Sequence, residues 1–202
     1  MHIVCLDLEG VLVPEVWINF AERTGIDALR LTTRDIPDYD ELMRGRLKIL
    51  GEHGLGLRQI QEVIDGMEPL EGARAFLNDL RQDFQVIILS DTFYEFGMPL
   101  MRKLGMPCLF CHKLDVAADG AIAGYRLRQS DPKRKAVAAL KGLNFRVIAA
   151  GDSYNDTSML SEADAGVLFR APANVVREFP QFPVTETYQE LETAIRSAGG
   201  AM

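Results

Sequence analysis

The chain has 202 residues, of which 48% are hydrophobic, so it can bury a sizeable core in one large domain or in a domain with a small insertion. Its 29 acidic and 22 basic residues leave a formal charge of −7, which argues against nucleic acid binding and disfavours an anionic membrane surface. Its apolar runs are only strand-sized, and three cysteines fit a reducing compartment, so we expect a cytoplasmic protein.

Short apolar, β-branched runs recur along the chain and alternate with segments of helical spacing. Such an alternation is typical of a parallel sheet with helices on both faces. The expected strands are residues 3–8, 85–90, 145–151 and 165–169. The helices expected around them are residues 71–82, 95–105, 131–143 and 155–163. We therefore predict an α/β fold with a Rossmann-like parallel sheet.

The stretch between the first strand and the next core helix has no strand signal. It contains helical patterns at residues 15–26, 38–54 and 57–67. Because a parallel crossover needs only one helix, we interpret residues 14–71 as an insertion that forms a small helical cap domain. The catalytic core is then residues 1–13 and 72–202.

Two further features complete the predicted elements. Residues 112–128 alternate in polarity around Asp119-Gly120, a dipeptide typical of a hairpin turn, so we expect a hairpin that projects from the end of the sheet. Residues 183–202 indicate a short strand and a closing helix without visible chemistry.

Polar side chains follow the expected strands at the points where they end. The carboxyl ends of parallel strands meet at one edge of the sheet, where ligands bind in open α/β folds. The residues are Asp7, Glu9 and Gly10 after the first strand, Ser90 after the second, Lys133 at the start of the helix at 131–143, and Asp152 and Asp156 after the strand at 145–151. Acids held so close together repel each other and are costly to desolvate, which points to a metal ion.

Four of these segments together resemble a known family. DLEGV, ILSD, DPKRK and GDSYND are similar to the four signatures of the haloacid dehalogenase superfamily, and the resemblance covers the whole chain, including the helical cap. Within that superfamily the chain is most similar to phosphoserine phosphatase, through Glu15 and the cap segment YDELMRGRL. One position departs from the pattern: Glu9 stands where the family has a second aspartate. This glutamate resembles a bifunctional bacterial type that transfers phosphate from phosphoserine to homoserine as well as to water.

The resemblance implies a Mg²⁺-dependent reaction through an aspartyl-phosphate. Asp7 would be the nucleophile and a metal ligand, with Asp152 and the backbone carbonyl of Glu9 as further ligands. Asp156 would orient the ligands around the metal. The Glu9 side chain would serve as general acid and then as general base.

The resemblance also implies the groups that hold the substrate. Ser90 and Lys133 would bind the phosphoryl oxygens, and Gly10 would allow their close approach to the backbone. We prefer Lys133 to Lys135 because Lys133 shares a helix face with Val137. The role of Asp91, where phosphatases of this kind usually have glycine, stays open.

The cap would read the amino-acid part of phosphoserine. Arg46, in preference to Arg44, would bind the carboxylate, Glu15 would bind the ammonium group, and Asn155 would add a further contact. The substrates would be phosphoserine and homoserine, and a homodimer is possible. The alternatives are a phosphatase of the same fold for another small phosphomonoester and a non-catalytic phosphate-binding regulatory protein.

Overall fold

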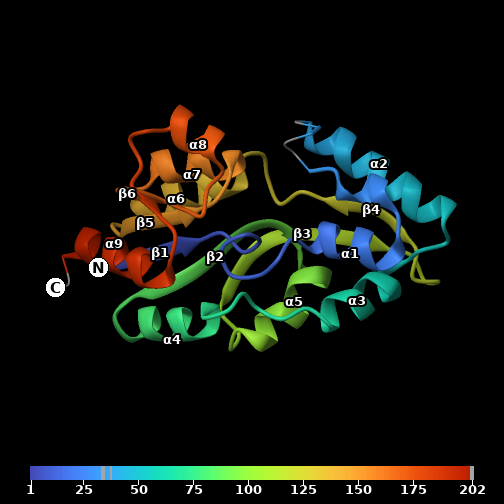
Figure 1. The fold of residues 1–202 in the computed structure, drawn as a ribbon, viewed down its shortest axis with the longest axis horizontal. Coiled ribbons are helices and arrows are strands. Elements are labelled where there is room, and N and C mark those ends of the chain that lie inside the picture. The colour runs from blue at the N-terminus through green and yellow to red at the C-terminus, as the bar shows by residue number, and fades with distance from the viewer. Residues whose placement is uncertain (33–34, 37, 201–202) are drawn as a thin grey trace.

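The structure is a computed structural model that describes residues 1–32, 35–36 and 38–200. Within these residues one seven-stranded sheet has the order β4-β3-β2-β1-β5-β6-β7, and all neighbouring strands are parallel except β3 and β4 (Figure 1). The strands are β1 His2–Leu6, β2 Gln85–Phe93, β3 Cys108–Val116, β4 Ile122–Arg126, β5 Arg146–Gly151, β6 Ala165–Phe169 and β7 Val184–Thr185. The predicted α/β architecture is thus confirmed.

Helices cover both faces of the sheet, so its central strands are buried on both sides. In β1, Val4 and Leu6 point to one hydrophobic cluster, and Ile3 and Cys5 point to a second one. The first cluster includes side chains of α4 Ala73–Asp83, α5 Tyr94–Lys103 and α9 Tyr188–Gly199. The second includes side chains of α6 Pro132–Gly142, α7 Thr157–Glu162 and α8 Ala173–Glu178.

The predicted cap helices lie between β1 and α4 in the sequence. They are α1 Val16–Thr24, α2 Tyr39–Glu52 and α3 Leu57–Asp65, with the short 3-10 helix η1 Asp27–Arg30. Trp17 and Phe20 are buried, and the Trp17 ring lies 5.7 Å from the Phe96 ring of α5. One hydrophobic cluster therefore runs from the cap helices into the sheet. The domain boundaries at 13/14 and 71/72 stay predictions.

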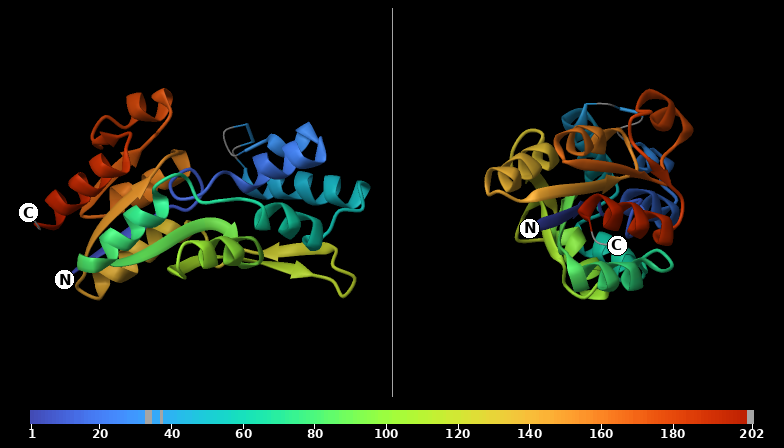
Figure 2. Two further views of the ribbon diagram at one scale, coloured as in Figure 1. Left: turned by 60° about the horizontal axis from the view of Figure 1, so that its bottom comes forward. Right: turned by 90° about the vertical axis from the view of Figure 1, so that its left-hand side faces the viewer.

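The predicted hairpin is formed by β3 and β4, which turn at Asp119-Gly120, where Gly120 has a φ of 89°. Figure 2 shows the hairpin alongside the cap helices at one end of the molecule, with both termini at the other end. Gly120 accepts a 2.9 Å hydrogen bond from the backbone N–H of Leu57, and the Tyr125 hydroxyl contacts the Asp40 carboxylate at 2.5 Å. The hairpin is thus bound to the cap.

Two strands extend beyond the predicted ranges. The first half of β3, at Cys108–Phe110, is a parallel neighbour of β2, although the sequence indicated only the hairpin that follows it. Strand β2 continues past Ser90 to Phe93, with an irregularity in its register. In the described part of the chain, no helix combines the length and apolar character that crossing a lipid bilayer requires.

Candidate active site

The polar residues predicted from the strand ends meet at the carboxyl edge of the sheet. Most of them line a cavity of about 110 Å³ between this edge and the cap, and the fully buried Asp156 lies behind this lining. The cavity is lined from the core by Asp7, Glu9, Ser90, Asp91, Thr92, Phe93, Lys133, Asp152, Ser153 and Asn155, and from the cap by Glu15, Trp17, Thr32, Tyr39, Leu42 and Arg46.

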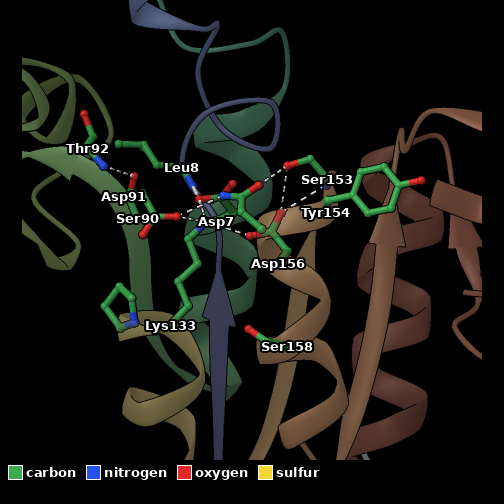
Figure 3. Close-up of polar contacts among 12 residues, drawn as sticks. Asp7, Leu8, Ser90, Asp91, Thr92, Lys133, Ser153, Tyr154, Asp156 and Ser158 are labelled. Atoms are coloured by element: carbon green, nitrogen blue, oxygen red, sulfur yellow. Dashed lines mark hydrogen bonds and ion pairs between the residues drawn. The ribbon is translucent and has the colours of Figure 1, made fainter. Parts of the chain in front are cut away.

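A buried lysine lies between two buried carboxylates at the floor of this cavity. The Lys133 Nζ is 2.7 Å from Asp7 Oδ1 and 2.7 Å from Asp156 Oδ1 (Figure 3). Burial, together with repulsion from Asp156, raises the pKa of Asp7 well above its ordinary value, although Lys133 opposes this shift. Burial alone would disfavour the ammonium ion, but Asp156 and Asp7 raise the pKa of Lys133 well above its ordinary value.

Three buried acids form the strongest candidate metal site. Asp7, Asp152 and Asp156 offer oxygen atoms that all lie within 4.8 Å of one another. Asp156 is held by backbone N–H groups: its Oδ2 accepts hydrogen bonds from Asp152 at 3.0 Å and from Ser153 at 3.1 Å. An all-oxygen, acidic set of this kind fits a hard divalent cation such as Mg²⁺. A single lysine provides less positive charge than these carboxylates carry, so a cation would offset the remaining repulsion.

Glycines allow the acids to pack this closely. A Cβ atom at Gly10 would lie 2.5 Å from Asp152 Oδ2, and one at Gly151 would lie 2.3 Å from Asp156 Cγ. Gly10 also has a φ of 80°, which side-chain-bearing residues rarely adopt. In the structure, the group that approaches Gly10 closely is therefore the Asp152 carboxylate. The backbone N–H of Gly10 donates to the Val13 carbonyl at 2.9 Å.

The two acids at the end of β1 have different partners. The Asp7 side chain faces Lys133, whereas Glu9 Oε2 accepts a 2.9 Å hydrogen bond from the backbone N–H of Val16. Val16 is the first residue of α1, and the first N–H groups of a helix have no partner within the helix. Glu9 thus connects the loop after β1 to the cap.

An irregularity in β2 brings Ser90 into the cavity wall. Leu89 pairs with Phe110, and Phe93 pairs with His112, so β2 has two residues more than β3 over this stretch. Such bulges re-aim side chains next to active sites. The Ser90 Oγ accepts the Thr92 N–H at 3.2 Å, which leaves its own hydroxyl proton able to donate into the cavity. Ser90 does not cap the following helix α5.

Arg46 is the buried cation of the cap side. Its guanidinium lies 4.4 Å above the centre of the Trp17 ring, and Nη2 donates to the Leu31 carbonyl at 2.8 Å. Within the described chain, Arg46 Nε is a buried donor without a hydrogen-bond partner. Burial lowers the pKa of Arg46 to about 10, so the group stays charged at neutral pH.

Of the remaining residues named from the sequence, some line the cavity and others lie outside it. Glu15 and Asn155 line the cavity. The alternatives to Lys133 and Arg46 do not: Lys135 is half-buried and bonds to Ser130, and Arg44 is exposed and bonds within α2.

The chain resembles known proteins in both sequence and fold. Residues 1–164 match the haloacid dehalogenase-like hydrolases. The chain is 67% identical over 192 residues to a Pseudomonas aeruginosa protein named phosphoserine phosphatase ThrH, a match that covers 95% of this chain and 94% of that protein. The chain belongs to the haloacid dehalogenase-like hydrolases. A phosphoserine phosphatase of Pseudomonas syringae is 64% identical over 95% of this chain and 81% of its own length. A solved substrate-bound phosphoserine phosphatase complex shares the fold, with a TM-score of 0.78 at 19% identity, over 94% of this chain and 96% of that one.

Several side chains near the site of this haloacid dehalogenase-like hydrolase were not among the predicted residues, and three of them make contacts that bear on it. Tyr39 of α2 lines the cavity and donates its hydroxyl to the Asp91 carbonyl at 3.0 Å. His112 of β3 is buried beside Asp91, and Trp17 of α1 lines the cavity. The i, i+3 spacing of Trp17 and Phe20 is typical of the buried face of a helix, but no local pattern places Tyr39 or His112 at the site.

Proposed function

We propose that this protein is a Mg²⁺-dependent phosphoserine phosphatase that acts through an aspartyl-phosphate and also transfers the phosphoryl group to homoserine. The observation that carries the proposal is the buried Asp7, 2.7 Å from the Lys133 ammonium, at the floor of a cavity whose cap side presents the buried Arg46. Those groups match the phosphate at one end of phosphoserine and the carboxylate at its other end. The names of the two Pseudomonas relatives support the same substrate.

Mg²⁺ would be held by Asp7, Asp152 and the backbone carbonyl of Glu9, with Asp156 orienting them. When bound, it would neutralise the charge of the phosphoryl group and of the attacking carboxylate. The N–H groups that fix Asp156 and the glycine at position 10 keep these oxygens close together.

The phosphoryl transfer uses Asp7 as the nucleophile. Its carboxylate attacks phosphorus, the bond from phosphorus to the serine oxygen breaks, and an aspartyl-phosphate forms. Ser90 donates its hydroxyl proton to one phosphoryl oxygen, and Lys133 contacts another as a compact positive charge. Both side chains are buried, so their hydrogen bonds are made in a low dielectric.

Glu9 handles the protons of both half-reactions. As an acid it protonates the departing serine oxygen, and as a carboxylate it then removes a proton from water or from the homoserine hydroxyl. The second acceptor releases phosphohomoserine in place of inorganic phosphate. Glutamate has one methylene more than aspartate, which lets its carboxylate reach the acceptor hydroxyl of a bulkier alcohol.

The cap distinguishes phosphoserine from other phosphomonoesters. The free Nε of Arg46 and its neighbouring nitrogen atoms suit a carboxylate, and stacking on Trp17 fixes the plane of the guanidinium. Glu15 suits the ammonium group on the same side of the cavity, and Asn155, which also lines the cavity, adds a further contact.

The experiment is a turnover assay with phosphoserine and Mg²⁺, with and without homoserine, that measures free phosphate and phosphohomoserine. Phosphate release that depends on Mg²⁺, with part of it diverted to phosphohomoserine, supports the proposal. Faster hydrolysis of another small phosphomonoester would refute the substrate assignment. A lack of turnover on every phosphomonoester would refute the enzymatic role. Unchanged partition between the two acceptors in Glu9→Asp would refute the role of the methylene.

A further inference from the structure

Asp91 lies beside the proposed phosphate site without a role in the reaction derived above. The irregular stretch of β2 carries it, directly after Ser90, to the wall of the cavity. Its side chain is 28% exposed, so solvent reaches it less than it would an ordinary surface acid. An acid next to a site for a phosphate dianion is unfavourable for binding, because like charges repel. The position therefore calls for an explanation.

Donors from three other elements hold the Asp91 carboxylate in place. Oδ2 accepts a hydrogen bond from Asn155 Nδ2 at 3.1 Å and lies 3.7 Å from Lys133 Nζ. Oδ1 lies 3.6 Å from His112 Nε2. Because His112 Nδ1 accepts the backbone N–H of Arg128 at 3.1 Å, the ring proton of neutral His112 is on Nε2, toward Asp91.

These contacts also fix the charge of Asp91. Burial would raise its pKa, but Lys133, His112 and Asn155 outweigh burial and lower the pKa of Asp91 to about 2. The group is therefore a carboxylate at neutral pH. Its backbone carbonyl accepts the Tyr39 hydroxyl at 3.0 Å, so the cap also contributes to its position.

Lys133 consequently faces three carboxylates. Two of them are the proposed nucleophile Asp7 and its neighbour Asp156, each with an oxygen atom 2.7 Å from Lys133 Nζ. Asp91 is the third, on the side of Ser90 (Figure 3). A phosphoryl group bound to Ser90 and Lys133 would have to share the ammonium with Asp91. The hold of Lys133 on phosphate is then weaker than that of a lysine without this third acid.

We infer that Asp91 is a positioning residue that weakens the binding of the phosphoryl group to Lys133. Inorganic phosphate therefore leaves the site readily after each turnover. His112 and Asn155 keep the carboxylate at the distance where it repels the product without displacing Lys133 from Asp7. This inference rests on the proposed function, because it places phosphate on Ser90 and Lys133.

The test is the isosteric variant Asp91→Asn, which keeps the shape and removes the charge. Inorganic phosphate is used as a competitive inhibitor of phosphoserine turnover, and its binding with Mg²⁺ present is measured by calorimetry at one pH. Loss of the negative charge of a carboxylate that lies 3.7 Å from the ammonium group binding the dianion should tighten phosphate binding by about 3-fold to 10-fold. Asp115→Asn is the matched control, because Asp115 pairs with Arg126 on the exposed hairpin, where phosphate binding should not change.

The outcomes separate this inference from the proposed function. Tighter phosphate in Asp91→Asn, with unchanged melting temperature and unchanged behaviour of Asp115→Asn, supports the inference. Unchanged or weaker phosphate binding in Asp91→Asn, with the wild type still hydrolysing phosphoserine, overturns the inference alone. A wild type that neither binds phosphate nor hydrolyses phosphoserine overturns both.

Discussion

The hydrogen bond from the Val16 N–H to Glu9 can be removed without changing Glu9. Val16 is the first residue of α1, the helix position that proline tolerates best, because the N–H there has no partner within the helix. The preceding residue, Glu15, has φ −61° and ψ 119°, which a following proline accepts. Val16→Pro therefore deletes the donor to Glu9 and keeps the helix.

The size of the effect follows from the geometry of this contact. A partly buried N–H group 2.9 Å from a carboxylate is a charge-assisted hydrogen bond worth about 1.5–3 kcal/mol. If the bond orients the general acid, kcat should fall by at least about 10-fold in Val16→Pro. The KM for phosphoserine should stay nearly constant, since the Glu9 side chain transfers protons and does not bind the substrate.

The assay is steady-state phosphate release from phosphoserine with saturating Mg²⁺. Val16→Ala is the control, because it trims the same buried side chain and retains the N–H. Circular dichroism shows whether both variants stay folded. Equal kcat values for the two variants would refute the idea that the cap orients Glu9 through this bond.

Three other predictions concern the phosphate site, the acidic cluster and the cap. Lys133→Ala should lower kcat/KM by at least about 100-fold, because the transferred phosphoryl group loses the buried ammonium that contacts it. Lys135→Ala should change kcat/KM by less than about 2-fold, and similar losses in both variants would contradict the assignment. Gly10→Ala places a methyl group 2.5 Å from Asp152 Oδ2 at a φ of 80°, so Mg²⁺-dependent activity and melting temperature should both fall, and a fully active variant would refute the tight packing. Arg46→Lys should raise the KM for phosphoserine by about 10-fold with little change in kcat, since an ammonium cannot replace a bidentate fork; an unaltered KM would remove Arg46 from substrate binding.

The sequence was sufficient to predict most strands of the sheet and the polar residues at their carboxyl ends. Asp7, Lys133 and Asp152 could be placed together because parallel strands end at the same edge and helix α6 begins beside it. The preference for Lys133 over Lys135 followed from the helical spacing to Val137, and Lys133 is indeed the buried residue of the two.

Other features depend on contacts between elements that are distant in the sequence. The two extra residues of β2 have no local signal, because a bulge shows only when the partner strand is known. For the same reason the contact of Asp91 with His112 could not be predicted. The bond from Val16 to Glu9 depends on how α1 is oriented against the core, and the stacking of Arg46 on Trp17 depends on how α2 lies across α1.

The most direct test of the account is to identify the residue that carries phosphate during turnover. The enzyme is mixed with phosphoserine and Mg²⁺, quenched in acid within the first turnover, and digested for peptide mass spectrometry. The account predicts a phosphoryl adduct on Asp7, with neither adduct nor phosphate release in Asp7→Asn. A phosphoryl group on another residue, or full turnover by Asp7→Asn, would contradict it.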